Sequence, residues 1–138
     1  MLDRGLVVTI LVGVVSFHAA GCGSTPSSPS STSIAGTWTG SINDSAYGAG
    51  SVRLTFNQSG GPLTGTWSAT FANGVLTNTG SLSGSMNGSD ISAVLTPTDP
   101  LACPYNVTAT RTGNTITGTY AAFNCTASVT GSVNVTKQ

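Results

Sequence analysis

Few side chains in this 138-residue chain could carry out acid–base, nucleophilic or metal chemistry. The sequence contains no glutamate and a single histidine, His18, and the carboxylates beyond residue 21 are Asp44, Asp90 and Asp99. Serine and threonine are abundant, but no general base accompanies them to activate a hydroxyl as a nucleophile. Nothing in the pattern sets two carboxylates in surroundings that would separate their pKa values for catalysis. We therefore expect no enzymatic activity and no cofactor.

Charged residues are also scarce, at 6% of the chain against about 25% in an ordinary soluble domain. The four basic and four acidic residues cancel to a formal net charge of +0 at pH 7. A surface that binds nucleic acid needs a basic patch, which this composition does not supply. We therefore expect no nucleic acid among the partners.

The most reactive side chains are the cysteines, and Cys22 follows closely on an apolar run, Leu6–Phe17, that Arg4 precedes. A helix needs about 20 apolar residues to cross a bilayer, so this shorter run is typical of the hydrophobic region of a signal peptide. A buried core helix or an uncleaved anchor is the alternative. The polar, low-complexity sequence that follows at once favours the signal peptide.

The residues Ala19–Cys22 resemble the lipobox of bacterial lipoproteins, in which small residues precede an obligatory cysteine, although that family usually has leucine where Ala19 stands. The resemblance implies that the Cys22 thiol receives a diacylglyceryl group and that the peptide is cut before Cys22. It also implies that the new amine is acylated with a fatty acid such as palmitate. Two or more acyl chains hold a protein stably in a lipid bilayer, which is then the partner of this segment.

Gly23, in place of aspartate, resembles the pattern of lipoproteins that are sorted to the outer membrane of the cell envelope. We therefore expect the folded domain to lie outside the cytoplasm. The alternative is ordinary secretory cleavage near Ala19 or Ala20, which leaves Cys22 as a free thiol.

The sequence predicts three segments: a signal peptide at 1–21, a lipidated and flexible Ser/Pro-rich tether at 22–33, and one folded domain at 34–138. Residues 23–33 contain no apolar side chain that could pack, so we expect a solvated tether that reaches about 20–35 Å. His18 is removed with the signal peptide, and two remaining thiols are too few for a metal site, so we expect no metal.

From Ile34 onward, apolar and hydroxyl side chains alternate with a period of two, which is typical of β-strands with one dry and one wet face. Eight such segments are separated by turn signals such as Asn73-Gly74, Asn87-Gly88 and Gly113-Asn114. Longer connections are expected around Asn43–Gly50 and Pro97–Pro104. The pattern predicts an all-β, eight-stranded antiparallel up-and-down meander.

We expect this meander to close into a barrel. An open sheet defends its edges with charges or prolines, and the domain has few charges to place there. The inward parity also contains glycines, which relieve crowding where strands coil tightly. An immunoglobulin-like β-sandwich is the alternative.

Gly36–Trp38, at the head of the first expected strand, resembles the Gly-x-Trp start of the calycins, the superfamily of lipocalins and avidins. The resemblance implies that Trp38 plugs one end of the barrel and that Lys137, on the last strand, packs over its indole. A cation over an indole face contributes roughly 0.5–2 kcal/mol.

The segment Leu63–Trp67 looks avidin-like in its spacing, but the avidin function does not carry over. Where that family has asparagine, tyrosine and serine for biotin, this chain has Gly40, Trp67 and Ala69. Biotin would lose most of its hydrogen bonds, and unpaired buried polar groups are costly.

We place Cys103 and Cys125 at the starts of the sixth and eighth strands, on the inward parity. Those strands run in the same direction, so both thiols would lie at one end of the barrel. Outside the cytoplasm we expect them to form a disulfide.

Two functions fit these expectations. In the first, a membrane-anchored, lipocalin-like barrel binds a small apolar molecule, and an apolar void above about 300 Å³ would favour it. The walls of that void would come from Phe56, Trp67, Phe71, Met86, Tyr105 and Tyr120. In the second function, a filled barrel is a structural or interaction module that contacts an envelope protein, a glycan or a protease.

Overall fold

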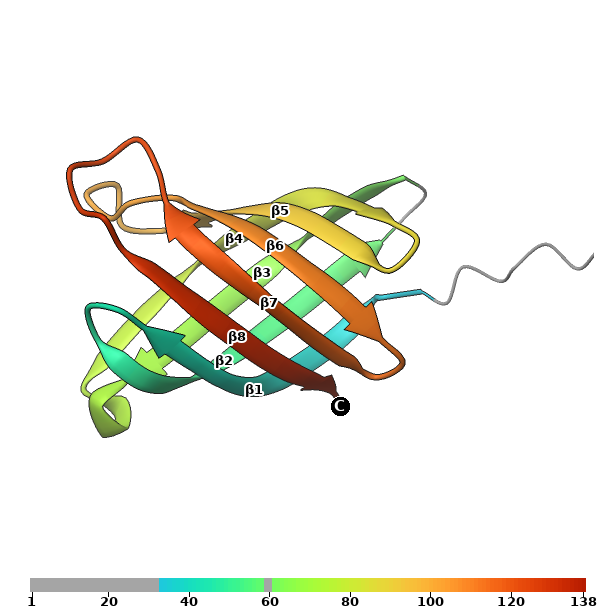
Figure 1. Cartoon of the computed structure of the whole chain (residues 1–138), viewed down its shortest axis with the longest axis horizontal. Helices are drawn as coiled ribbons and strands as arrows, with labels where there is room; N and C mark the ends of the chain where they lie inside the picture. The colour runs from blue at the N-terminus through green and yellow to red at the C-terminus, as the bar shows by residue number, and fades with distance from the viewer. Residues whose placement is uncertain (1–32, 59–60) are drawn as a thin grey trace, which may run out of the picture. The chain divides into compact units, whose positions relative to one another are not determined.

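The computed structural model describes residues 33–58 and 61–138, so the predictions for the signal peptide, for Cys22 and for most of the tether lie outside the described residues. The described chain forms eight strands and one short 3₁₀ helix, η1 (Figure 1). The elements are β1 Gly36–Asp44, β2 Gly48–Gln58, β3 Pro62–Phe71, η1 Ala72–Gly74, β4 Leu76–Asn87, β5 Asp90–Pro97, β6 Tyr105–Thr112, β7 Thr115–Ala122 and β8 Thr130–Lys137.

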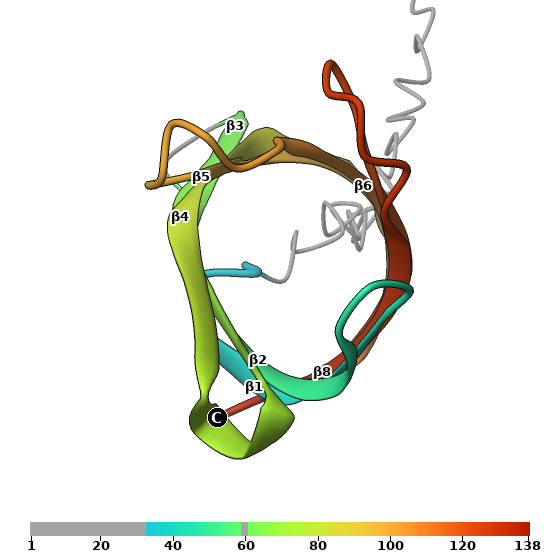
Figure 2. The ribbon, with the colours of Figure 1, turned by 90° about the vertical axis from the view of Figure 1, so that its left-hand side faces the viewer.

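The strands pair in sequence order, every pair antiparallel, and β8 pairs with β1 to close the barrel. Figure 2 shows this ring of strands from one end. The β1–β8 register runs from Trp38 opposite Lys137 to Asp44 opposite Gly131. The closed up-and-down barrel is confirmed, and the β-sandwich is excluded because the first and last strands are hydrogen-bonded neighbours.

The two ends of the barrel differ in their connections. The β4–β5 and β6–β7 connections lie at the end where the described chain begins and where the C-terminus is found, which we call the plugged end (Figure 1). The opposite end, which we call the loop end, carries the segments 45–47, 72–75, 98–104 and 123–129. The long connection expected around Asn43–Gly50 is only a short turn, because β1 and β2 pair as far as Asp44 and Gly48. A longer loop is found instead between β7 and β8.

Period-two alternation places the apolar side chains inside the barrel and the threonine and serine side chains outside. Inward side chains from every strand are buried, and Trp38, Leu63 and Val135 are fully enclosed. Three aromatic rings lie opposite a glycine on the next strand: Phe56 opposite Gly65, Trp67 opposite Gly80, and Tyr120 opposite Gly131.

These glycines allow close packing that any other residue would prevent. A Cβ atom at Gly65 would overlap the backbone of Thr55, and one at Gly131 would overlap the Tyr120 ring. The inward glycines therefore relieve crowding as expected, because aromatic rings and neighbouring backbone occupy the space that a side chain would fill.

Cys103 and Cys125 form a disulfide, with their Cα atoms 5.8 Å apart. Neither residue begins a strand: β6 starts at Tyr105 and β8 starts at Thr130. The prediction of their strand positions was wrong because each strand is shorter at this end than the alternation suggested. The disulfide links the β5–β6 and β7–β8 loops, both at the loop end.

Replacing Cys103 and Cys125 together by serine should lower the free energy of unfolding by about 3 kcal/mol, since the bond closes a segment with a sequence separation of 22. Urea denaturation would measure this loss. Wild-type protein in reductant is the control and should match the double variant. Equal urea midpoints for oxidised wild type and the variant would contradict the expectation.

Candidate functional site

The plugged end is sealed by Trp38, which is 0% exposed and packs edge-on against Phe56, with 6.4 Å between ring centroids. The indole N–H of Trp38 donates to the Ile34 carbonyl at 2.9 Å. The Lys137 Nζ atom lies 5.8 Å from the ring centroid, and the Arg111 guanidinium lies 5.4 Å from it. Two cations therefore face this indole.

Arg111 was not expected in the plug, although the alternation contained the signal. Tyr105, Val107 and Ala109 take the inward parity of β6, and Arg111 continues it. The parity of Arg111 therefore directs its side chain toward the indole.

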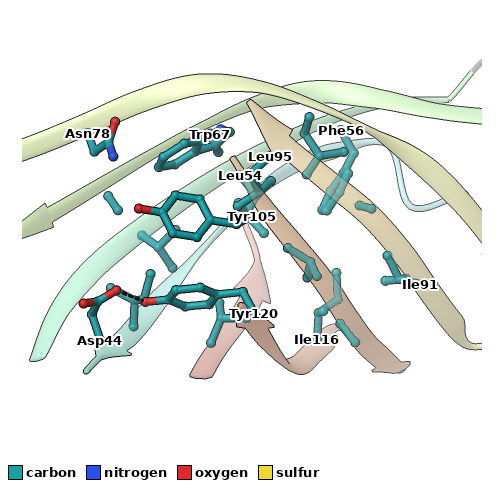
Figure 3. A pocket seen from close by; sticks show the side chains of 18 of the residues that line it. Asp44, Leu54, Phe56, Trp67, Asn78, Ile91, Leu95, Tyr105, Ile116 and Tyr120 are labelled. Carbon is teal, nitrogen blue, oxygen red and sulfur yellow. Dashed lines mark hydrogen bonds between the residues drawn. The ribbon is translucent and has the colours of Figure 1, made fainter. Parts of the chain in front are cut away.

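A cavity of about 60 Å³ lies inside the barrel, and its lining runs from Asp44 and Tyr47 at the loop end to Ile91 and Ile116 near the plugged end. It is lined almost wholly by apolar atoms, and its walls include Phe56, Trp67, Phe71, Tyr105 and Tyr120 (Figure 3). Binding pockets for drug-sized ligands measure about 300–1,000 Å³. The interior is therefore largely filled by its own side chains.

Met86, the remaining residue expected in the walls, does not line the cavity. It pairs with Ile91 next to the β4–β5 turn, at the plugged end, where it packs half-buried against the core. Its inward parity was assigned correctly, but parity does not decide which inward side chains reach the cavity, since the paired Ile91 lines it and Met86 does not.

A buried hydrogen bond joins Asp44 and Tyr120 at the edge of the cavity (Figure 3). The Tyr120 hydroxyl donates to Oδ2 of Asp44 at 2.6 Å, across a sequence separation of 76. Asp44 on β1 lies opposite Gly131 on β8, and Gly131 lies opposite Tyr120 on β7. The Tyr120 ring crosses β8 through the space that a side chain at position 131 would fill.

Asp44 also ends β1. Its Oδ1 atom accepts the backbone N–H groups of Ala46 at 2.8 Å and Tyr47 at 3.1 Å, which is the hydrogen bonding of an Asx turn. All three partners of Asp44 are donors, so its carboxyl group acts as an acceptor-only carboxylate. Sequence reasoning placed Asp44 at a turn and missed its inward position, which the parity of Trp38, Gly40 and Ile42 indicated.

The two tyrosines beside Asp44 are held as neutral phenols. The pKa of Tyr120 is raised strongly from 10.0, first by burial and then by its hydrogen bond to Asp44 and the charge of that residue. The pKa of Tyr105 is raised by burial, then by the charge of Asp44. In both cases loss of the phenolic proton would place a second negative charge beside Asp44 in a poorly solvated site.

The aromatic rings near Asp44 form a connected group. Trp67 meets Tyr105 edge-on at 6.3 Å between centroids, and Tyr105 meets Tyr120 edge-on at 5.5 Å. Tyr47 lies 5.5 Å from Phe71 in a tilted pair. The Trp67 indole N–H is buried and has no hydrogen-bond acceptor among the described residues.

The rim of the loop end exposes large apolar side chains. Leu101 is 92% exposed and Val75 is 87% exposed, and Tyr47 and Leu76 are also exposed. These are the exposed large apolar side chains of the described chain, and all of them lie in or beside the connections at the loop end.

The fold and site together define a closed eight-stranded antiparallel β-barrel with one plugged end and one loop end that carries an apolar rim. No protein-family model matches the chain, and no curated protein matches its sequence.

Within residues 33–58 and 61–138, no helix is both long and apolar enough to cross a membrane. In that same part of the chain, His, Cys, Asp and Glu side chains form no group of three that could hold a metal ion.

The raised pKa of Tyr120 predicts a loss of stability in alkali. The folded protein binds the phenolic proton more tightly than the unfolded chain, whose tyrosine pKa is about 10, so the contribution is full below pH 10 and falls above it. The free energy of unfolding should fall by up to about 1.4 kcal/mol per pH unit from this group.

Urea denaturation of wild type and Tyr120→Phe between pH 8 and 12 measures this slope. The variant should be less stable at pH 8, because Asp44 loses a hydrogen bond, and its stability should fall less steeply above pH 10. Tyr47→Phe, at the exposed ring beside the same turn, is the control and should keep the wild-type slope. Identical slopes for wild type and Tyr120→Phe would contradict the role of Tyr120.

Proposed function

We propose that the protein is a lipid-anchored lipoprotein of the bacterial cell envelope. Its non-catalytic, calycin-like barrel serves as an interaction module and contacts its partner with the loop end. The observation that carries this proposal is the gathering of Tyr47, Val75, Leu76 and Leu101 on the rim of one end. All the exposed large apolar side chains of the described chain lie at this end, and apolar surface concentrated in one region of a small protein is typical of an interaction site.

Three features support this assignment. The small cavity favours a filled scaffold over a container for a drug-sized ligand. The Cys103–Cys125 bond links two of the loops that would meet the partner, which limits the entropy lost on binding. Residue 33, where the tether is expected to end, lies at the plugged end, opposite the loop end that carries the apolar rim.

The resemblance to calycins gains support from the plug. Trp38 near the start of β1 is enclosed and lies beneath Lys137 of β8, which is the arrangement that the resemblance implies. We assign no calycin ligand to this chain, because the lumen is too small for one of ordinary size.

The lipid anchor is tested by mass spectrometry of the protein purified from its native membrane. The expected chain begins at Cys22 and carries a diacylglyceryl group on the thiol and a fatty acyl group on the amine. The Cys22→Ser variant should keep residues 1–21 and lack both lipids. A wild-type chain that begins before Cys22, or that carries a free thiol there, would refute the anchor.

The interaction surface is tested by a photo-reactive amino acid placed at position 101 in living cells. We expect a cross-linked adduct of defined mass from position 101, since Leu101 projects from the loop end. Position 108 is the matched control, because Thr108 is exposed on the outer wall of β6. Equal cross-linking from both positions would contradict a partner at the loop end.

A further inference from the structure

A buried negative charge at the loop end, that of Asp44, has no basic side chain beside it within residues 33–58 and 61–138. Asp44 is 6% exposed, and its three hydrogen-bond partners are neutral donors. A buried charge is costly unless a charge of opposite sign or a set of hydrogen bonds compensates it. Three neutral hydrogen bonds solvate the carboxylate but leave its charge in place.

The cations of the described chain lie elsewhere. Arg111 and Lys137 face the Trp38 ring in the plug, at the opposite end of the barrel. Arg53 is exposed in the middle of β2, on the outer face. The field of Asp44 in the cavity is therefore not cancelled by a basic side chain of residues 33–58 or 61–138.

The cavity that Asp44 borders is rich in aromatic rings. Tyr47, Trp67, Phe71, Tyr105 and Tyr120 all line it, and Figure 3 shows Tyr105 between Trp67 and Tyr120 on the side of Asp44. The faces of aromatic rings attract cations, and the attraction is strongest when the cation is shielded from water. An anionic carboxylate and several aromatic rings around one small cavity favour a positively charged occupant.

From this arrangement we infer that the cavity binds a quaternary ammonium group, such as the trimethylammonium head of choline. The walls are almost wholly apolar, which suits methyl groups better than the N–H donors of a primary ammonium ion. Asp44 supplies the charge, and the rings of Trp67, Tyr105 and Tyr120 supply cation–π contacts.

The size of the cavity sets what part of the ligand enters. A volume of about 60 Å³ takes only a compact group, so the remainder of the molecule stays at the loop end. This binding depends only on the barrel and goes beyond the proposed role as an anchored interaction module. It can hold or fail whether or not Cys22 is lipidated.

Isothermal titration calorimetry of the full chain in a non-ionic detergent tests this inference with three probes. Choline carries the trimethylammonium head, 3,3-dimethylbutanol has the same shape without the charge, and ethanolamine has the charge without the methyl groups. We expect choline to bind at least tenfold more tightly than either analogue. No heat of binding from choline, or equal affinity for 3,3-dimethylbutanol, would overturn the inference.

Variants locate the site. Asp44→Asn keeps the shape of the side chain and removes its charge, so it should weaken choline binding at least tenfold. Asp99→Asn alters an exposed carboxylate of the β5–β6 loop at the same end and should bind choline as the wild type does. Wild-type affinity in Asp44→Asn would also overturn the inference.

A second pair of variants covers the case in which Asp44→Asn does not fold. Tyr105→Leu removes a ring from the cavity and should weaken choline binding, whereas Tyr105→Phe keeps the ring and should restore it. Equal affinity of the two variants would contradict a cation–π site.

Monomeric short-chain phosphatidylcholine distinguishes the two sources of the head group. Binding as tight as that of choline assigns a lipid head group, and tenfold weaker binding assigns a free solute. Both results presuppose that choline binds, so both are consistent with a quaternary ammonium site in the cavity.

Discussion

The hydrogen bonding of β1 to β8 is the interaction on which the other features of the molecule depend. It leaves no strand of the barrel with a free edge, so a chain that is 6% charged needs no charged residues to protect one. The same register places Trp38 beside Lys137 at one end and Asp44 beside Gly131 at the other. Closure therefore assembles both the plug and the polar edge of the cavity.

Glycine shapes the interior as much as the apolar residues do. Where Phe56, Trp67 and Tyr120 face a glycine on the next strand, the ring lies over the backbone and fills the lumen. Large rings over missing side chains explain why an eight-stranded barrel retains only a small cavity. Gly131 has a further role, since it opens the path by which Tyr120 reaches Asp44.

The ends of the barrel carry different physical properties. The plugged end holds two of the few cations over a buried indole, and the tether is expected to join the barrel there. The loop end combines an apolar rim, a disulfide and a buried carboxylate beside aromatic rings. The features that could meet a partner or a ligand are therefore concentrated at the loop end.

The strands, their inward faces and the closed barrel were predictable from the sequence, because alternation is local and closure leaves no edge that charged residues would have to protect. It also carried the inward parity of Asp44 and Arg111, since each continues the pattern of its strand. Only the folded structure shows that Tyr120 meets Asp44, that Met86 does not line the cavity, and that the cysteines lie in loops. Those outcomes depend on register, side-chain packing and strand length, which arise from contacts between residues far apart in the chain and leave no trace in local periodicity.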